Sequence, residues 1–152
     1  MNINAKYFLG LFLLSASLQA FAFDYHGIKS GMAANEVNSQ IGCTEYCSSI
    51  DYRQIETFFG EENRPPALWT MSFSYTSDDK LWRIQLSFIE RSGTGGVAQQ
   101  RILAELYPDA DLQKSSSSNE YGTTNFINAL LVDNTLFKRD VEKIYNETKS
   151  KY

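Results

Sequence analysis

The chain has 152 residues, with 14 lysines and arginines against 18 aspartates and glutamates, and its formal net charge is −4. A mildly acidic chain without a basic cluster is poorly suited to nucleic acid or to an anionic membrane surface, so we expect its partners to be proteins or small molecules. This length fits one domain built around one hydrophobic core and leaves no room for two.

The first 22 residues, MNINAKYFLGLFLLSASLQAFA, have the features of a secretory signal peptide. Lys6 provides a positive charge, an apolar run extends to about Leu18, and small residues flank Phe21. Polar residues interrupt the run well before the roughly 18 apolar residues that a spanning helix needs, which disfavours a membrane anchor. We predict cleavage after Ala22, no stable membrane insertion afterwards, and a single α+β domain over residues 23–152 that is periplasmic or secreted.

Residues 33–41 carry apolar side chains with the spacing of one helical face, and Gly42 follows as a C-terminal stop. The pattern predicts a short helix that packs on a sheet. Its apolar members are Ala33, Ala34, Val37 and Ile41. Met32 and Val37 have the spacing of a hydrophobic staple at the start of the helix.

The chain has two cysteines, Cys43 and Cys47, with three residues between them. In an exported protein we expect a disulfide, and the chain-entropy model gives about 2 kcal/mol for so short a loop. Free thiols are one alternative. Redox catalysis is another, although it normally uses two intervening residues. Metal binding would need two more ligands, and His26 is the sole histidine. We therefore expect no metal and no cofactor.

Residues 50–59, IDYRQIETFF, mix β-branched and aromatic residues without a firm period, which predicts an edge strand. Residues 60–68, GEENRPPAL, predict a loop that the adjacent prolines Pro65 and Pro66 hold extended.

Residues 68–75 and 81–89 alternate between apolar and polar side chains, with the turn TSDDK between them. This predicts an antiparallel hairpin with one buried, aromatic-rich face and one polar face. The predicted buried residues are Trp69, Met71, Phe73, Tyr75, Trp82, Ile84, Leu86 and Phe88. The predicted polar face, our candidate binding face, comprises Thr70, Ser72, Ser74, Arg83, Gln85 and Ser87.

After a glycine-rich connection at 92–96, SGTGG, residues 97–107 place Ala98, Ile102, Leu103 and Leu106 on one helical face. Residues 114–125 predict a polar loop or hairpin tip, and 126–132 predict a covered central strand. Residues 135–152 predict a terminal amphipathic helix. Together the elements predict an α+β two-layer domain, with helices on one face of an antiparallel sheet and the polar face open.

The stretch GIKSGMAANEVNSQIGC, residues 27–43, resembles the opening of a family of small exported domains. The matching residues are Gly31, Met32, Glu36, Val37 and Gly42. The family includes the outer-membrane assembly lipoprotein of the SmpA/OmlA type and the beta-lactamase inhibitory protein. The resemblance implies a helix-helix-sheet unit that binds other proteins rather than catalysing a reaction.

This chain departs from that family in two places. Ala33 stands where the family usually has the serine or threonine that caps the helix, a loss of about 1 kcal/mol. The assembly lipoproteins also carry a lipidated cysteine at the mature N-terminus, which is missing here, so membrane anchoring does not transfer.

Few residues could carry catalysis. His26 lies close to the predicted mature N-terminus, which suits preorganised catalysis badly, and we expect a solvated surface histidine. Two aspartate pairs, Asp78 with Asp79 and Asp109 with Asp111, could serve glycoside hydrolysis or a hard metal ion. Both pairs occupy positions where turn geometry alone favours aspartate. We therefore predict no catalytic residue.

The first functional hypothesis is a non-enzymatic module that binds another protein of the cell envelope through the polar hairpin face, as an inhibitor, an assembly factor or an immunity-type protein. The second is a small-ligand carrier with a pocket between the helices and the aromatic face. The third, for which the sequence supplies no assembled site, is a small hydrolase.

Overall fold

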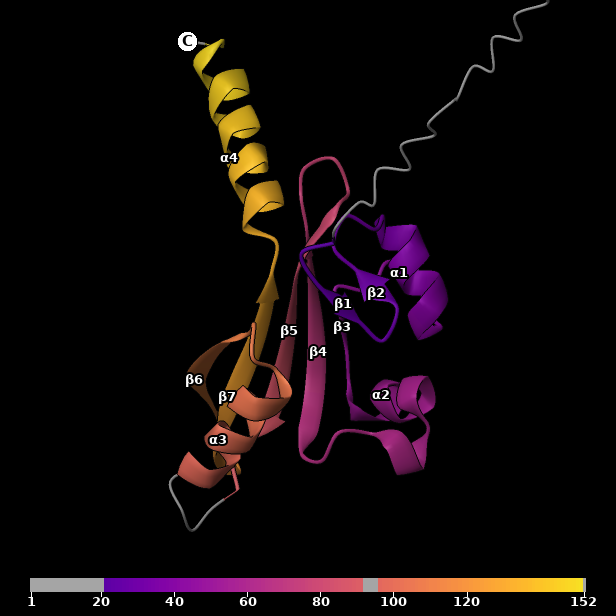
Figure 1. Cartoon of the computed structure of the whole chain (residues 1–152), viewed down its shortest axis with the longest axis vertical. Coiled ribbons are helices and arrows are strands. Elements are labelled where there is room, and N and C mark those ends of the chain that lie inside the picture. Colours follow the sequence, from indigo (N-terminus) through magenta and orange to yellow (C-terminus); the bar gives the residue numbers. More distant parts are fainter. Residues whose placement is uncertain (1–20, 92–95, 152) are drawn as a thin grey trace, which may run out of the picture.

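A computed structural model describes residues 21–91 and 96–151. The predicted signal peptide lies outside the described residues except for its last two positions, and so does most of the glycine-rich connection, 92–95. Within the described chain there are four α-helices, a five-stranded antiparallel sheet and a two-stranded sheet (Figure 1). The predicted α+β class is confirmed.

The strands of the large sheet follow the order β3-β4-β5-β7-β6, and every neighbouring pair is antiparallel. These strands are β3 (Ser49–Ile50), β4 (Leu68–Tyr75), β5 (Leu81–Ile89), β6 (Asp111–Asn119) and β7 (Gly122–Val132). The small sheet pairs β1 (Asp24–Tyr25) with β2 (Ile28–Lys29). The helices are α1 (Ala34–Ile41), α2 (Tyr52–Phe59), α3 (Val97–Leu106) and α4 (Asn134–Lys149), with a 3₁₀ turn, η1 (Glu61–Asn63), after α2.

The predicted hairpin is β4 and β5, and its alternation sets the inner face of the sheet. Met71 pairs with Leu86 and Phe73 with Ile84, and all four side chains are buried. They form one cluster with inward residues of β7 and with buried residues of three helices. The helix contributions are Val37 and Ile41 of α1, Ile55 of α2 and Leu103 of α3.

Both tryptophans were predicted to be buried, and for Trp69 this prediction is wrong. The ladder between β4 and β5 shifts register twice, between Leu68 and Thr70 and between Ser74 and Tyr75. Such a bulge inserts one residue and reverses the side-chain alternation beyond it. At the first bulge Leu68 takes the inward position and is 1% exposed, whereas Trp69 is 41% exposed and stacks on Tyr52 at 5.1 Å.

At the other end of the hairpin the same shift places Leu81 inside. Leu81 pairs with Tyr75 and is fully buried, while Trp82 is half-buried with its ring 4.6 Å from that of Phe137. At the two ends of the hairpin, Trp69 and Trp82 therefore lie at the margin of the core, and Leu68 and Leu81 take the buried positions.

The edge strand predicted over residues 50–59 is wrong, because most of this segment is helix α2. The strand is limited to Ser49–Ile50. Asp51 then caps the helix, since its side chain accepts the backbone N–H groups of Arg53 and Gln54, and Gln54 Oε1 accepts the N–H of Asp51 at 3.1 Å. This reciprocal pair is a capping box, and its D-x-x-Q pattern was readable in the sequence.

The polar segment 114–125 forms more strand than we predicted. It belongs to a long hairpin of β6 and β7, and only residues 120–121 lie between the two strands. Serines in β6 carry weak strand preference, but β6 is an edge strand whose backbone is paired by β7. The predicted covered strand is confirmed: β7 lies between β5 and β6, and residues 127–130 are buried.

The start of α1 is stabilised by a carboxylate from the hairpin turn. Ala33 offers no side-chain cap, as the sequence indicates. Glu36 Oε2 accepts the Ala33 N–H at 2.7 Å, and the carboxylate of Asp79 accepts the Ala34 N–H at 3.3 and 3.4 Å. Negative charge is favourable at a helix N-terminus. Asp79 therefore ties the β4–β5 turn to α1.

The terminal helix α4 is confirmed as a helix, but it covers no part of the core. Asp133 caps it through the N–H groups of Thr135 and Leu136, yet none of its residues is buried. Figure 1 shows α4 continuing from the end of β7 away from the sheet. Its apolar face, which is 41 to 64% exposed, comprises Phe137, Val141, Ile144 and Tyr145.

Tyr75 has a buried hydroxyl with no hydrogen-bonding partner among the described residues. An unsatisfied buried hydroxyl is destabilising, so we expect Tyr75→Phe to raise the free energy of unfolding by about 1 kcal/mol at neutral pH. Burial also raises the pKa of this phenol above its ordinary value.

Because the pKa of Tyr75 is higher in the folded chain than in the unfolded chain, ionisation of this phenol favours unfolding. The free energy of unfolding is therefore unaffected by this group below about pH 10 and falls as the pH rises further. Tyr75→Phe should therefore unfold less readily than the wild type above pH 10, as measured by urea titration across pH. Tyr121→Phe, at an 89% exposed position, is the control. A Tyr75→Phe variant less stable than the wild type would contradict the prediction.

Candidate binding site

The polar face of the hairpin is where the sequence predicted it, on the side of β4 and β5 opposite the core. Five of its six predicted members are half-buried and Ser87 is buried. The half-buried members are Thr70, Ser72, Ser74, Arg83 and Gln85. They are less accessible than an open face would be, because neighbouring strands and their own hydrogen bonds cover them.

The polar side chains of this face hydrogen-bond to one another. Gln85 Nε2 donates to Ser87 Oγ at 3.2 Å and to Asn128 Oδ1 at 3.4 Å, and Asn128 Nδ2 donates to Ser115 Oγ at 2.8 Å. Arg83 donates to Ser74 Oγ from Nε at 3.1 Å and from Nη2 at 2.9 Å. The sequence did not indicate that Asn128 and the β6 serines extend the face. A shallow hollow of about 280 Å³ lies over them beside Trp69.

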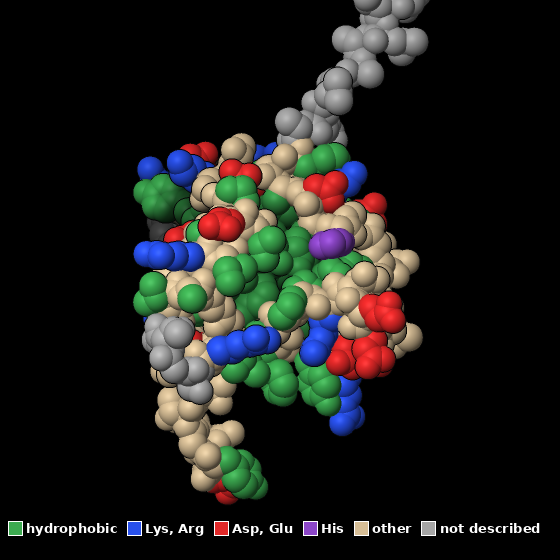
Figure 2. Space-filling model, turned by 60° about the horizontal axis from the view of Figure 1, so that its bottom comes forward, with side chains coloured by type: hydrophobic (Ala, Val, Ile, Leu, Met, Phe, Trp, Pro, Cys, Tyr) green, Lys and Arg blue, Asp and Glu red, His purple; other side chains and the backbone are tan. Residues whose placement is uncertain are grey.

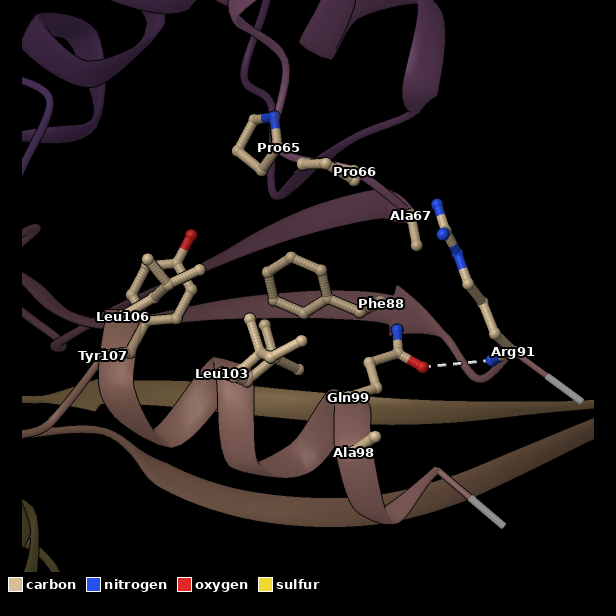
Figure 3. A pocket seen from close by; sticks show the side chains of 11 residues that line it. Pro65, Pro66, Ala67, Phe88, Arg91, Ala98, Gln99, Leu103, Leu106 and Tyr107 are labelled. Atoms are coloured by element: carbon tan, nitrogen blue, oxygen red, sulfur yellow. Dashed lines mark hydrogen bonds between the residues drawn. The ribbon is translucent and has the colours of Figure 1, made fainter. Parts of the chain in front are cut away.

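A larger and mostly apolar pocket lies on the opposite side of the sheet, between α3 and the segment that leads into β4. Its volume is about 500 Å³. The apolar residues that line it include Pro65, Pro66, Phe88, Ile102, Leu103 and Leu106. In Figure 3 the prolines lie above the Phe88 ring and the α3 residues below it. From that side of the molecule, Figure 2 shows apolar side chains gathered around a hollow.

The pocket exists because α3 buries only part of its apolar face. Leu103 reaches the core and is 4% exposed, but Ile102 is 56% and Leu106 63% exposed. The sequence placed all three on one helical face. On the far wall Pro65 and Pro66 cannot donate backbone hydrogen bonds, and they keep the chain extended rather than folded against α3.

The polar groups at the pocket are few, and most are engaged. Gln99 Oε1 accepts the Arg91 N–H at 3.0 Å, and Gln99 Nε2 donates to the carbonyl of Ile89 at 2.9 Å. The Tyr107 hydroxyl lies 3.5 Å from that of Tyr25. Burial, with this hydrogen bond, raises the pKa of Tyr25, so the Tyr25 hydroxyl stays protonated at physiological pH.

His26 borders two smaller hollows beside this pocket. It is exposed, as predicted, but it does not lie on a loose terminus. Its ring makes edge contacts at 4.8 Å with Tyr25 and with Phe59, and the adjoining Tyr25 and Ile28 are buried. The β1–β2 hairpin therefore anchors this segment.

Three of the four paired aspartates form structural contacts. Thr76 Oγ1 donates to Asp78 at 2.8 Å, which lowers the pKa of that carboxyl, and Asp79 binds the start of α1. Asp111 accepts from Gln113 at 2.7 Å, and Asp109 is exposed and borders one of the hollows that His26 also borders. The described residues contain no group of three or more His, Cys, Asp or Glu side chains that could hold a metal ion.

No family model, no curated protein and no solved structure matches this chain. Among the helices of the described residues, none is long and apolar enough to cross a membrane. The class of site must therefore be inferred from its own geometry. A pocket with apolar walls and few polar groups is typical of a binding site for an apolar group.

Proposed function

We propose that this protein is an exported, non-enzymatic binding module, and that its binding site is the apolar pocket between α3 and Pro65–Pro66. The pocket itself carries the proposal: about 500 Å³ lies within the usual range for small-molecule sites, and its walls are largely apolar. We also propose a two-layer arrangement like that of the inhibitory-protein family, supported by the shared core of α1, α2, α3 and the sheet.

Three observations support export and a binding role. The first 22 residues have signal-peptide features, and Cys43 and Cys47 form a disulfide, a bond that is common in exported proteins. Among the candidate catalytic residues, His26 contacts aromatic rings, and Asp78 and Asp79 hold the hairpin turn.

A neutral fluorescent probe, N-phenyl-1-naphthylamine, tests the site. We expect saturable binding of one probe per chain. Ala98 lines the pocket from an exposed position on α3, so Ala98→Trp should fill the space and weaken binding at least tenfold. Ala104→Trp places the same side chain at an exposed α3 position that does not line the pocket, and should bind like the wild type.

Thermal unfolding should show that both tryptophan variants remain folded. Equal binding by folded Ala98→Trp and Ala104→Trp, or no saturable binding by the wild type, would rule out this pocket as the site.

A protein partner on the polar hairpin face is the second candidate. The exposed Trp69 beside the serine-lined hollow favours it, because exposed tryptophans often anchor protein interfaces. A purified partner that binds this face should be weakened by Arg83→Glu and unaffected by Ala98→Trp. The reverse pattern would place that partner on the apolar pocket.

A further inference from the structure

The apolar pocket has one free charge at its edge. Arg91, at the end of β5, lines the pocket, and its guanidinium makes no hydrogen bond or ion pair with any described residue. No aspartate or glutamate is among the lining residues. A pocket with apolar walls and a single unpaired cation is complementary to a ligand with a long apolar body and one negative charge.

The position of Arg91 is set by Gln99 of α3. The two ends of the Gln99 amide bind the backbone on either side of Glu90, at the Ile89 carbonyl and at the Arg91 N–H. Figure 3 shows the hydrogen bond between Gln99 and the Arg91 N–H, with Arg91 and Gln99 at one end of the pocket and Leu106 and Tyr107 at the other. Both polar ends of Gln99 are thus engaged by the backbone of the β5 end.

Two other nearby cations already have anionic partners. Arg64, next to Pro65, pairs with Glu56 at 3.5 Å, and Lys114 pairs with Glu90 at 3.5 Å. Among the described residues that line the pocket, a dianionic phosphate headgroup would find only the cation of Arg91, which suits a monoanion better. A planar guanidinium also matches the two oxygens of a carboxylate.

We propose that the pocket binds a free long-chain carboxylate. Its hydrocarbon chain lies along Phe88, Leu103 and Leu106, and its carboxylate pairs with Arg91. This inference rests on the proposed function, since it names the ligand class of the same pocket.

A chain-length series of carboxylates tests the apolar part by displacement of N-phenyl-1-naphthylamine. Each added methylene should tighten binding about fourfold from octanoate upward, until the pocket is full. Ala98→Trp should abolish the increase in affinity with chain length, and Ala104→Trp should retain that increase.

The charged part is tested with dodecanoate against dodecanol, which has a similar chain and no charge. Arg91→Gln should weaken dodecanoate binding about fivefold, the upper end for an exposed ion pair, and leave dodecanol unchanged. Arg101→Gln is the matched control, because Arg101 is an exposed α3 arginine that does not line the pocket. Added salt should weaken dodecanoate binding to the wild type more than to Arg91→Gln.

The outcomes separate the two proposals. If the neutral probe binds but dodecanoate binds no tighter than dodecanol, and Arg91→Gln does not change dodecanoate binding, the pocket remains the binding site. The proposal that its ligand is a carboxylate is then overturned. If no probe or amphiphile binds, the proposed function fails as well. If the protein binds anionic phosphatidylglycerol vesicles but no soluble dodecanoate, the site docks on a membrane and the free carboxylate is likewise overturned.

Discussion

Leu68→Ala is expected to lower the free energy of unfolding by about 2–5 kcal/mol, the usual range for a fully buried leucine. Trp69→Ala removes a larger side chain from the next position and should cost only about 1 kcal/mol, close to the value of its aromatic stacking. The reason is the bulge at the start of β4, which leaves Leu68 1% exposed and Trp69 41% exposed.

Urea unfolding followed by circular dichroism measures both changes. Met71→Ala, at a buried position where the alternation is regular, should match Leu68→Ala in size. A loss for Trp69→Ala as large as that for Leu68→Ala would mean that the strand keeps an unbroken alternation, contrary to the structure.

Loss of the disulfide should have the second large effect. The bond joins Cys43, directly after the glycine that ends α1, to Cys47, with Cα atoms 6.4 Å apart. The double variant Cys43→Ser, Cys47→Ser should lose about 2 kcal/mol of stability, because the unfolded chain is released from a short loop.

Dithiothreitol should destabilise the wild type by the same amount and leave the double variant unchanged. Neither cysteine lines the apolar pocket, so the folded double variant should still bind N-phenyl-1-naphthylamine like the wild type. If reduction left the wild type as stable as before, the disulfide would not contribute to the stability of the fold.

Local patterns in the sequence were sufficient for several elements. The spacing from Ala34 to Ile41 and the terminal Gly42 identified α1, and period-two alternation identified β4 and β5. These patterns reflect burial of one side of an element, which nearby residues record directly. Helix α2 was missed because aromatic and β-branched residues outweighed its capping box at Asp51 and Gln54.

The candidate site was only partly predictable. Alternation placed Thr70, Arg83 and Gln85 on one polar face, but the hydrogen bond from Asn128 to Ser115 joins strands whose pairing is set by the β6–β7 hairpin. The apolar face of α3 was also recognised, yet nothing local distinguished Leu103, which is buried, from Ile102 and Leu106, which are exposed.

The sequence by itself determined the α+β class, most of the amphipathic elements, and the pairing of two nearby cysteines, since these depend on neighbours within a few residues. Only the tertiary structure decided which apolar side chains remain uncovered. Their exposure depends on the distance in space between α3 and Pro65–Pro66, two segments that the whole β4–β5 hairpin separates in the sequence. This distance leaves the pocket beside Arg91 open, and both functional proposals depend on that open pocket.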